Sequence, residues 1–168
     1  MNGCIQAYVV DASTHLLSCS QWGGAEQGIY RSEDGGDSWF QVSPTSGGRP
    51  PLVASDGVLY WAAETYNGLQ RSEDQGLTWS ATRGGALVSA IRPIELPDGR
   101  IASTTNEYVV VSDDRGDSWR RVSARMPYKP DYFAYSAFQK AFFIISNLCQ
   151  EAISSNAIMR YDFDYEIE

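Results

Sequence analysis

The chain has 168 residues, of which 43% are hydrophobic and 20% are charged, with a formal net charge of −8. These proportions are ordinary for a soluble globular protein, and the length allows one core or about four repeats of about 40 residues. The negative charge argues against nucleic acid or an anionic membrane as partner, because both attract basic surfaces. No apolar run is long enough to span a membrane and no signal peptide is visible, so the compartment stays undecided.

In chain order, apolar alternation and turn residues predict short strands throughout and no helix. The predicted strands are 5–10, 16–22, 28–32 and 38–43; 51–54, 58–63, 68–72 and 78–82; 90–96, 100–105, 108–112 and 118–122; and 132–138, 141–147 and 157–162. They fall into four units, about 1–45, 46–85, 86–124 and 125–168. We predict an all-β chain built as a single domain.

An eight-residue pattern occurs three times at a constant spacing of 40 residues, at 32–39, 72–79 and 112–119. A repeat of that length matches one four-stranded blade of a β-propeller. Its short aspartate can accept backbone hydrogen bonds, its glycine permits a positive φ, and its tryptophan offers a large apolar surface. We therefore predict tight structural turns formed by Ser32, Asp34, Gly36, Trp39, Ser72, Asp74, Gly76, Trp79, Ser112, Asp114, Gly116 and Trp119.

The three copies resemble the Asp-box, or bacterial neuraminidase repeat, of sialidases, xyloglucanases, sortilin-type receptors and photosystem II assembly factors. The resemblance implies a sialidase-like propeller in which these turns are structural and lie at the periphery, away from the ligand. Acidic pairs such as Asp34 and Asp37 could suggest calcium binding, but the sequence lacks the long oxygen-rich loop that a calcium site uses. We expect no metal and no cofactor.

The fourth unit ends after its third strand, so about three and a half blades are present. Open sheet edges invite pairing, and propellers normally close on themselves. We expect the chain to be the C-terminal part of a larger propeller whose missing half covers these edges. Closure by self-association is the alternative.

Antiparallel connections place the longer, irregular loops on one face, where function usually concentrates. Aromatic, carboxylate and guanidinium groups there predict recognition of carbohydrate. The predicted ligand-binding residues are Trp22, Glu26, Arg49, Trp61, Glu64, Tyr66, Asn67, Arg83, Arg125 and Tyr128. The alternative for Trp22 and Trp61 is packing between blades.

Catalytic residues are weakly indicated. Glu64 could pair with Asp131 or Glu107, since glycoside hydrolysis needs two carboxyl groups or a tyrosine nucleophile with an acid. Tyr135 stands in an Ala-Tyr-Ser segment similar to the stretch that carries the sialidase nucleophile, although a strand position explains it as well. The Arg-Ile-Pro motif of sialidases is missing, so we do not expect this chain alone to be a working sialidase.

Two functions therefore remain open from the sequence. The first is a sialidase-like protein that recognises carbohydrate, with glycoside hydrolysis in the intact protein. The second is a non-enzymatic scaffold of the sortilin or assembly-factor kind that binds a protein partner.

The cysteines are three, Cys4, Cys19 and Cys149. A bridge between Cys4 and Cys19 across one hairpin is conceivable, but the odd number and the lack of a metal spacing favour three buried thiols.

Overall fold

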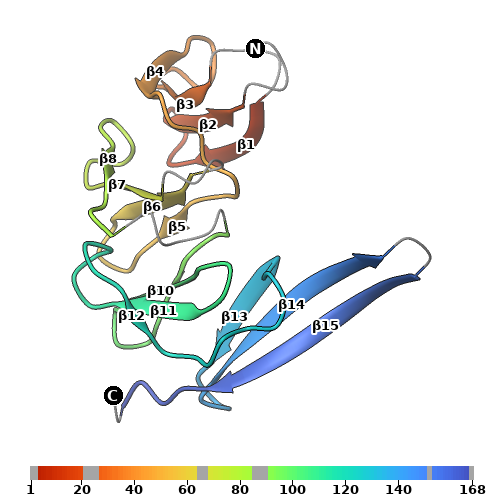
Figure 1. The fold of residues 1–168 in the computed structure, drawn as a ribbon. Coiled ribbons are helices and arrows are strands. Elements are labelled where there is room, and N and C mark those ends of the chain that lie inside the picture. The colour runs from red at the N-terminus through yellow and green to blue at the C-terminus, as the bar shows by residue number, and fades with distance from the viewer. Residues whose placement is uncertain (1–3, 21–26, 64–67, 85–90, 151–152, 167–168) are drawn as a thin grey trace.

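The computed structural model describes residues 4–20, 27–63, 68–84, 91–150 and 153–166, and all regular structure among them is β-strand (Figure 1). The strands are β1 (Cys4–Val9), β2 (His15–Cys19), β3 (Gly28–Ser32), β4 (Phe40–Ser43), β5 (Leu52–Val53), β6 (Leu59–Ala62), β7 (Leu69–Ser72), β8 (Ser80–Ala81), β9 (Ile94–Glu95), β10 (Ile101–Thr104), β11 (Val109–Ser112), β12 (Arg120–Arg121), β13 (Tyr132–Ser136), β14 (Ala141–Gln150) and β15 (Ile153–Asp162). No helix in this part of the chain is long and apolar enough to cross a membrane. The predicted all-β class is confirmed.

The strands form four antiparallel sheets in chain order. Sheets 1, 2 and 3 contain β1–β4, β5–β8 and β9–β12, each paired in sequence order, and sheet 4 contains β13–β15. Figure 1 shows the sheets following one another along an arc, with sheet 1 at one end and sheet 4 at the other. The four-stranded antiparallel units predicted from the repeat are confirmed.

Each junction between neighbouring sheets has its own hydrophobic core. Leu16 and Ile29 of sheet 1 pack with Leu59 and Trp61 of sheet 2. The next junction joins residues of sheets 2 and 3, among them Leu52, Tyr60, Leu69, Ile101 and Val110. The third joins sheets 3 and 4 through Leu96, Ala102, Val109, Phe142 and Ile144. The molecule is therefore held together between the faces of consecutive sheets.

The three repeats form matching turns between the third and fourth strands of their sheets; we call 32–39, 72–79 and 112–119 the repeat turns. In the second, Ser72 Oγ donates to Asp74 Oδ1 at 2.8 Å and accepts from the Gly76 N–H at 2.8 Å. Asp74 also accepts from the Thr78 N–H at 2.9 Å and the Thr78 hydroxyl at 2.6 Å. The other two turns repeat these four hydrogen bonds.

Gly76 shows why this turn needs glycine. Its φ is +88°, and a Cβ there would lie 2.6 Å from Cδ1 of Leu16 in the preceding sheet. Any larger residue would be strained in its backbone and would collide with the first junction core. The second repeat turn therefore packs against the preceding sheet as well as reversing the chain, and Gly116 places the third beside Leu69 and Thr82 in the same way.

The cysteine interpretation favoured by the sequence is wrong for two of the three residues. Cys4 and Cys19 form a disulfide, and they stand opposite one another in the β1–β2 pairing. The register of this hairpin brings the two residues together, which their count and spacing alone could not indicate.

The predicted strands 141–147 and 157–162 are also too short, since β14 extends to Gln150 and β15 begins at Ile153. The pairing of β14 with β15 continues without interruption to Leu148↔Ser155, Cys149↔Ser154 and Gln150↔Ile153. The hairpin projects well beyond the other sheets in Figure 1. Backbone hydrogen bonds can extend an existing hairpin regardless of its side chains. The polar residues at the end of this hairpin therefore form strands although they lack the apolar–polar alternation from which a strand is predicted.

Candidate functional site

The strand order sorts the connections onto two sides of the molecule. Turns β1–β2 and β3–β4, with their counterparts and all three repeat turns, lie at one end of the sheets, and we call it the turn side. The β2–β3 and β4–β5 connections and their counterparts lie at the opposite end, the loop side. Hydrogen bonds within the repeat turns occupy Asp34, Asp74 and Asp114. We therefore look for a binding surface on the loop side, where the longer connections lie.

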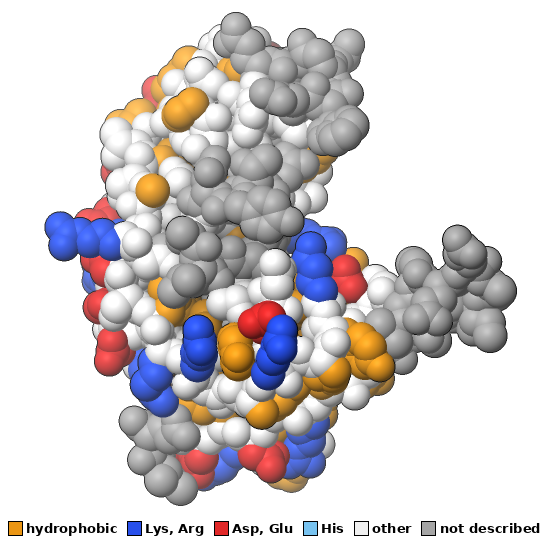
Figure 2. All heavy atoms as spheres, in the orientation of Figure 1, with side chains coloured by type: hydrophobic (Ala, Val, Ile, Leu, Met, Phe, Trp, Pro, Cys, Tyr) orange, Lys and Arg blue, Asp and Glu red, His pale blue; other side chains and the backbone are white. Residues whose placement is uncertain are grey.

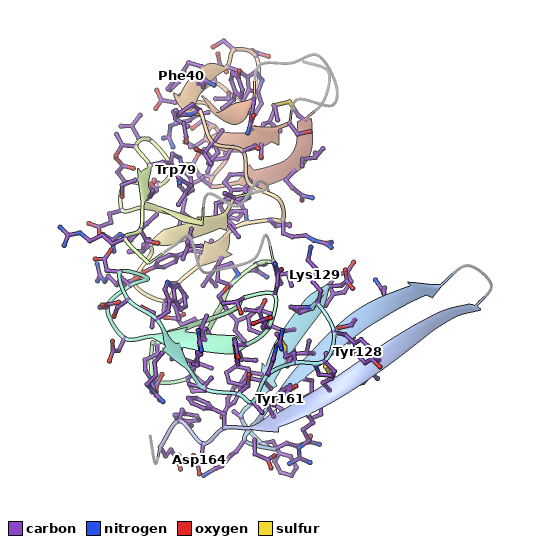
Figure 3. The ribbon with its side chains drawn as sticks, viewed as in Figure 1. Phe40, Trp79, Tyr128, Lys129, Tyr161 and Asp164 are labelled. Atoms are coloured by element: carbon purple, nitrogen blue, oxygen red, sulfur yellow. A yellow bond between two sulfur atoms is a disulfide. The ribbon has the colours of Figure 1, made fainter. Side chains whose placement is uncertain are left out.

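The loop side carries an arginine–tyrosine surface, drawn from the β4–β5, β10–β11 and β12–β13 connections and the strand ends beside them. It consists of Arg49, Tyr108, Arg121, Arg125, Tyr128, Lys129 and Tyr132. Figure 3 places Tyr128 and Lys129 beside sheet 4, and Figure 2 shows basic, acidic and hydrophobic side chains intermixed on the face in view.

Two guanidinium groups in this surface stack on tyrosine rings. Arg49 Cζ lies 4.7 Å from the ring centroid of Tyr132, and Arg49 Nη1 donates to the Tyr132 hydroxyl at 3.3 Å. Arg121 Cζ lies 4.4 Å from the ring centroid of Tyr108. Stacking holds each guanidinium through its face and leaves N–H donors around its edge for a ligand.

A third arginine is held by charge. Arg125 forms an ion pair with Glu107, and this hydrogen bond raises the pKa of Arg125. The Met126 N–H donates to the Glu107 carbonyl at 2.7 Å, which ties the β12–β13 connection to the β10–β11 connection. Tyr128 lies two residues after Met126 and is 44% exposed. The surface therefore combines ordered cations with an exposed aromatic ring.

In the described part of the loop-side connections, basic residues outnumber acidic ones, while Glu26, Glu64 and Glu151 of the same connections lie outside the described residues. The described connections carry Arg49, Arg83, Arg92, Arg125 and Lys129 against Glu107 and Asp131. The chain as a whole has a formal charge of −8. The described basic groups Arg49, Arg125 and Lys129 would favour acidic groups of a ligand near them.

The predicted ligand-binding residues divide into three groups. Trp22, Glu26, Glu64, Tyr66 and Asn67 lie outside the described residues. Arg49, Arg125 and Tyr128 belong to the arginine–tyrosine surface. Arg83 is exposed, and its N–H donates to Asp117 Oδ1 of the third repeat turn at 3.4 Å.

Trp61 does not face solvent. Its side chain is fully buried, its ring centroid lies 5.8 Å from that of Trp79, and its Nε1 donates to the Arg49 carbonyl. The assignment of Trp61 to a ligand-binding face is therefore corrected, and the alternative of packing between blades holds. A wide apolar ring at this position fills the first junction core, where a partly exposed sugar platform would have no room.

Of the three catalytic candidates, the two that the structure describes, Tyr135 and Asp131, lie at opposite ends of β13. Tyr135 donates its hydroxyl to the Phe163 carbonyl at 2.9 Å, and burial raises its pKa, which makes ionisation harder. Its ring packs among Phe142, Phe163 and Tyr165. Asp131 accepts from the Asn147 N–H at 2.7 Å, and Glu64 lies outside the described residues.

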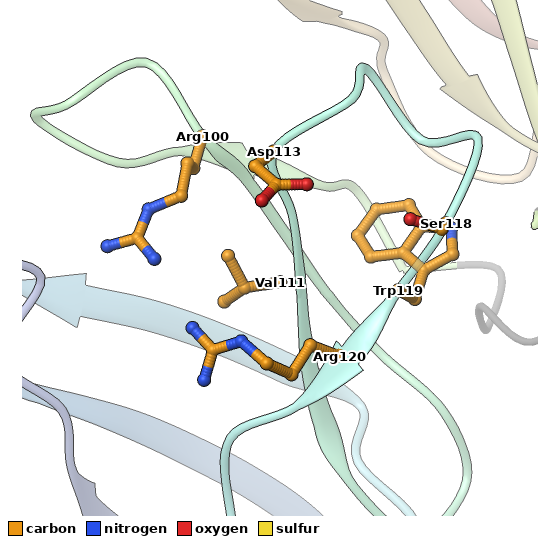
Figure 4. Close-up of a pocket in the computed structure, with 6 residues that line it drawn as sticks. All are labelled: Arg100, Val111, Asp113, Ser118, Trp119 and Arg120. Atoms are coloured by element: carbon orange, nitrogen blue, oxygen red, sulfur yellow. The ribbon is translucent and has the colours of Figure 1, made fainter. Parts of the chain in front are cut away.

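A hollow of about 210 Å³ opens beside the third repeat turn, lined by Arg100, Val111, Asp113, Ser118, Trp119 and Arg120 (Figure 4). A hollow of about 260 Å³ beside the second repeat turn is lined by Arg71, Glu73, Asp74, Thr78, Trp79 and Ser80. Most of the lining positions correspond across the 40-residue spacing. The hollows therefore come with the repeated turn geometry, and neither marks a specific site.

Comparison with known proteins rests on structure, since no family model and no curated protein sequence matches this chain. A GH74 enzyme from Niastella koreensis superposes with a TM-score of 0.57 at 15% identity, covering 89% of this chain and 27% of that one. YCF48 bound to D1 peptide gives 0.56 at 12% identity, covering 95% and 50%. YCF48 from Cyanidioschyzon merolae gives 0.53 at 11%, covering 94% and 56%.

The fold is a β-propeller. Sheets 1 to 4 are its blades, and the chain spans about a quarter to a little over half of the length of these propeller proteins. At identities this low the likeness concerns the fold only.

Sequence reasoning missed part of the arginine–tyrosine surface. Tyr108, Arg121, Lys129 and Tyr132 were predicted only as strand or loop residues. A signal was present in the segment from Tyr128 to Tyr132, where two tyrosines flank a lysine and an aspartate. What the sequence lacks is the blade curvature that brings the β4–β5 connection, with Arg49, against Tyr132.

Proposed function

We propose that this propeller is a non-enzymatic binding module that recognises an acidic peptide segment of a partner protein on its arginine–tyrosine surface. The observation that carries the proposal is the pair of stacked arginines, Arg49 on Tyr132 and Arg121 on Tyr108. Arginine and tyrosine are the residues that dominate protein-binding surfaces, because each gives a large contact at a small loss of side-chain freedom.

The chemistry of the surface suits carboxylates. A guanidinium offers two parallel N–H donors to a carboxylate, and stacking on a ring fixes its plane before the ligand arrives. The exposed ring of Tyr128 adds an apolar contact for a neighbouring side chain. One solved propeller, YCF48, is described as bound to a peptide, so the fold is compatible with this class of ligand.

The lack of a convergent catalytic group in the described residues supports the binding role over hydrolysis. Tyr135 lies at the turn-side end of β13 with its hydroxyl engaged, whereas Asp131 lies at the loop-side end. A retaining or inverting glycosidase needs its two reacting groups on either side of one glycosidic bond, at a separation of roughly 5 to 10 Å.

Carbohydrate recognition, with hydrolysis in an intact sialidase-like protein, is the second candidate. The exposed rings of Tyr128 and Tyr132 beside the Arg49 guanidinium favour it, because flat rings can cover the C–H face of a sugar. As part of either function we infer that the three repeat turns are Asp-boxes with a structural role. Their shared hydrogen bonds support that identification.

The deciding experiment probes a peptide array and a glycan array with the same labelled chain. The peptide array presents acidic, neutral and basic peptides of equal length. The proposal expects binding to acidic peptides, with about a tenfold loss for Tyr128→Ala and for Arg121→Ala. Phe138→Ala is the matched control, since this ring is 97% exposed at the opposite end of blade 4. Selective binding to glycans would favour the second candidate, and indifference to peptide charge would overturn the first.

A further inference from the structure

One contact is repeated between consecutive blades. Arg31 of β3 donates from Nη1 to the Gln75 carbonyl in the second repeat turn at 2.6 Å. Arg71 of β7 donates in the same way to the Arg115 carbonyl in the third repeat turn at 3.2 Å. Gln75 and Arg115 hold the same place in their turns, with φ of 59° and 60°. Each of these blades thus presents an arginine to the turn of the next blade.

The tryptophan of the receiving turn completes the same junction. Trp79 packs against the core that contains Leu16 and Ile29 of blade 1. Trp119 packs against the core that contains Leu52 and Leu69 of blade 2. A junction of this type therefore has a donor half, which is an arginine on an apolar sheet face, and an acceptor half, which is a repeat turn with its tryptophan.

The two halves are also absent together. Blade 3 has Val111 where the preceding blades have Arg31 and Arg71, and the described part of blade 4 contains no repeat turn. The junction between blades 3 and 4 is instead closed by aromatic packing around Phe142. An arginine at this position thus accompanies a repeat turn on the facing blade.

Blade 4 carries the donor half again. Arg160 is paired across the sheet with Phe143, as Arg31 is with Leu16. It also forms the ion pair two residues along the strand, with Asp162 at 2.9 Å, where Arg31 pairs with Glu33 at 3.0 Å. The difference is exposure: the Arg160 side chain is 55% exposed and that of Arg31 is 9% exposed.

The face around Arg160 is apolar and uncovered. Ile158 lies two residues before it on the same face and is 71% exposed, and Ile145, opposite Ile158 on β14, is 37% exposed. A second apolar surface of this kind occurs at the other end of the arc, where Ile5 and Val9 of β1 are 43% and 61% exposed.

Blade 1 carries the acceptor half. Gly35 stands where Gln75 and Arg115 stand, with φ of +75°, and no described residue donates to its carbonyl. Trp39 occupies the place of Trp79 and Trp119. The uncovered side of blade 1 is the side that each following blade uses to receive its predecessor.

We propose that two copies of this chain associate head to tail, with the Arg160 face of blade 4 of each copy docked on the first repeat turn of the other. Arg160 donates to the Gly35 carbonyl, and Trp39 packs on the Phe143 and Ile158 face. Each copy carries both halves, so two copies related by a half-turn make this contact twice and close a ring. Two copies give eight sheets, within the four to about eight blades usual for propellers.

The second copy is the favoured occupant because both halves of the missing junction lie on this one chain. The comparison structures agree in size, since the chain spans 50% and 56% of two solved YCF48 propellers. Repeats from a longer form of the protein are the competing occupant, and the experiment below separates the two.

The experiment is light scattering and sedimentation of the full 168-residue chain at rising concentration. We expect a particle of twice the 18.6 kDa of one chain. Ile158→Glu and Val9→Glu should each raise the dimer dissociation constant about tenfold or more by placing a charge in the interface. Both side chains are exposed in the single chain, so folding should persist, which circular dichroism checks. Leu77→Glu is the matched control, at an exposed position in the second repeat turn.

Mixing the two weakened variants gives the sharpest result. A head-to-tail contact between the intact blade 1 of the Ile158→Glu chain and the intact blade 4 of the Val9→Glu chain should restore the two-chain particle in the mixture. The proposed contact needs both faces, so each variant alone should weaken the dimer. If the Ile158→Glu chain or the Val9→Glu chain dimerises like wild type, the dimer does not use that face, and the proposal is overturned. A wild-type chain that stays monomeric at all concentrations overturns it as well and points to other repeats as the occupant.

Discussion

Asp74→Ala tests the structural role of the repeat turns. The Asp74 carboxylate accepts hydrogen bonds from the Ser72 hydroxyl, the Thr78 N–H and the Thr78 hydroxyl. Ser72 is buried and in turn holds the Gly76 N–H, next to the core of the first junction. Removing the carboxylate therefore loosens the turn and also its packing on the preceding blade.

The size of the effect follows from the exposure of these partners. A hydrogen bond to a charged group contributes roughly 1.5 to 3 kcal/mol in net terms, and exposed groups recover much of this from water. Thr78 is exposed, whereas Ser72 loses its acceptor inside the protein. We expect Asp74→Ala to lower the free energy of unfolding by about 2 kcal/mol, a fall in Tm of about 4 to 8 °C for a chain of this size. Asp74→Asn, which keeps one acceptor oxygen, should lose about half as much.

Urea and thermal unfolding followed by circular dichroism measure this directly. Asp37→Ala is the control, at an exposed aspartate of the first repeat turn whose carboxylate has no hydrogen-bond partner among the described residues, and it should stay within about 0.5 kcal/mol of wild type. If Asp74→Ala unfolds like wild type, or if Asp37→Ala is equally damaging, the hydrogen bonds of the turn do not stabilise the blade as described.

Three further outcomes follow from the structure. Trp61→Ala should destabilise the protein by about 3 to 5 kcal/mol in urea unfolding, because it empties the first junction core; a wild-type midpoint would contradict that burial. Replacing Cys4 and Cys19 together by serine should cost about 3 kcal/mol, since their bridge closes a 15-residue segment, and an unchanged midpoint would refute the bridge. Hydrogen bonds from Ser38 and Ser118 lower the pKa of Asp34 and Asp114 below the ordinary aspartate value of 3.8, so the stability that these carboxylates contribute is complete above pH 3.8 and is lost as the pH falls below it. Acid titration of the unfolding free energy should show this loss, and it should be smaller in Asp34→Asn.

The 40-residue repeat made most of the fold predictable. Strand alternation and turn residues are local properties, so the order of strands in each blade could be read from short segments. The position of Asp74 between Ser72 and Thr78 even indicated its hydrogen-bonded role. Local pattern could also place Tyr128 on the loop side.

Features that depend on contacts between distant segments could not be predicted. The Cys4–Cys19 bridge depends on the register of one hairpin, and the length of the β14–β15 hairpin depends on backbone pairing through polar residues. Trp61 has the same residue type and strand position whether it faces a ligand or a neighbouring blade. Only the packing of blade 1 on blade 2 decides between the two.

The most direct test of the account separates the scaffold from the binding surface. It is the titration of the acidic peptide selected on the array against Tyr128→Ala and Asp74→Asn, at a temperature where both variants are folded. The account predicts an affinity about tenfold weaker for Tyr128→Ala, and an affinity within about twofold of wild type for Asp74→Asn despite its lower Tm. Weakened binding by Asp74→Asn together with full affinity of Tyr128→Ala would contradict it and would place the ligand on the repeat turns.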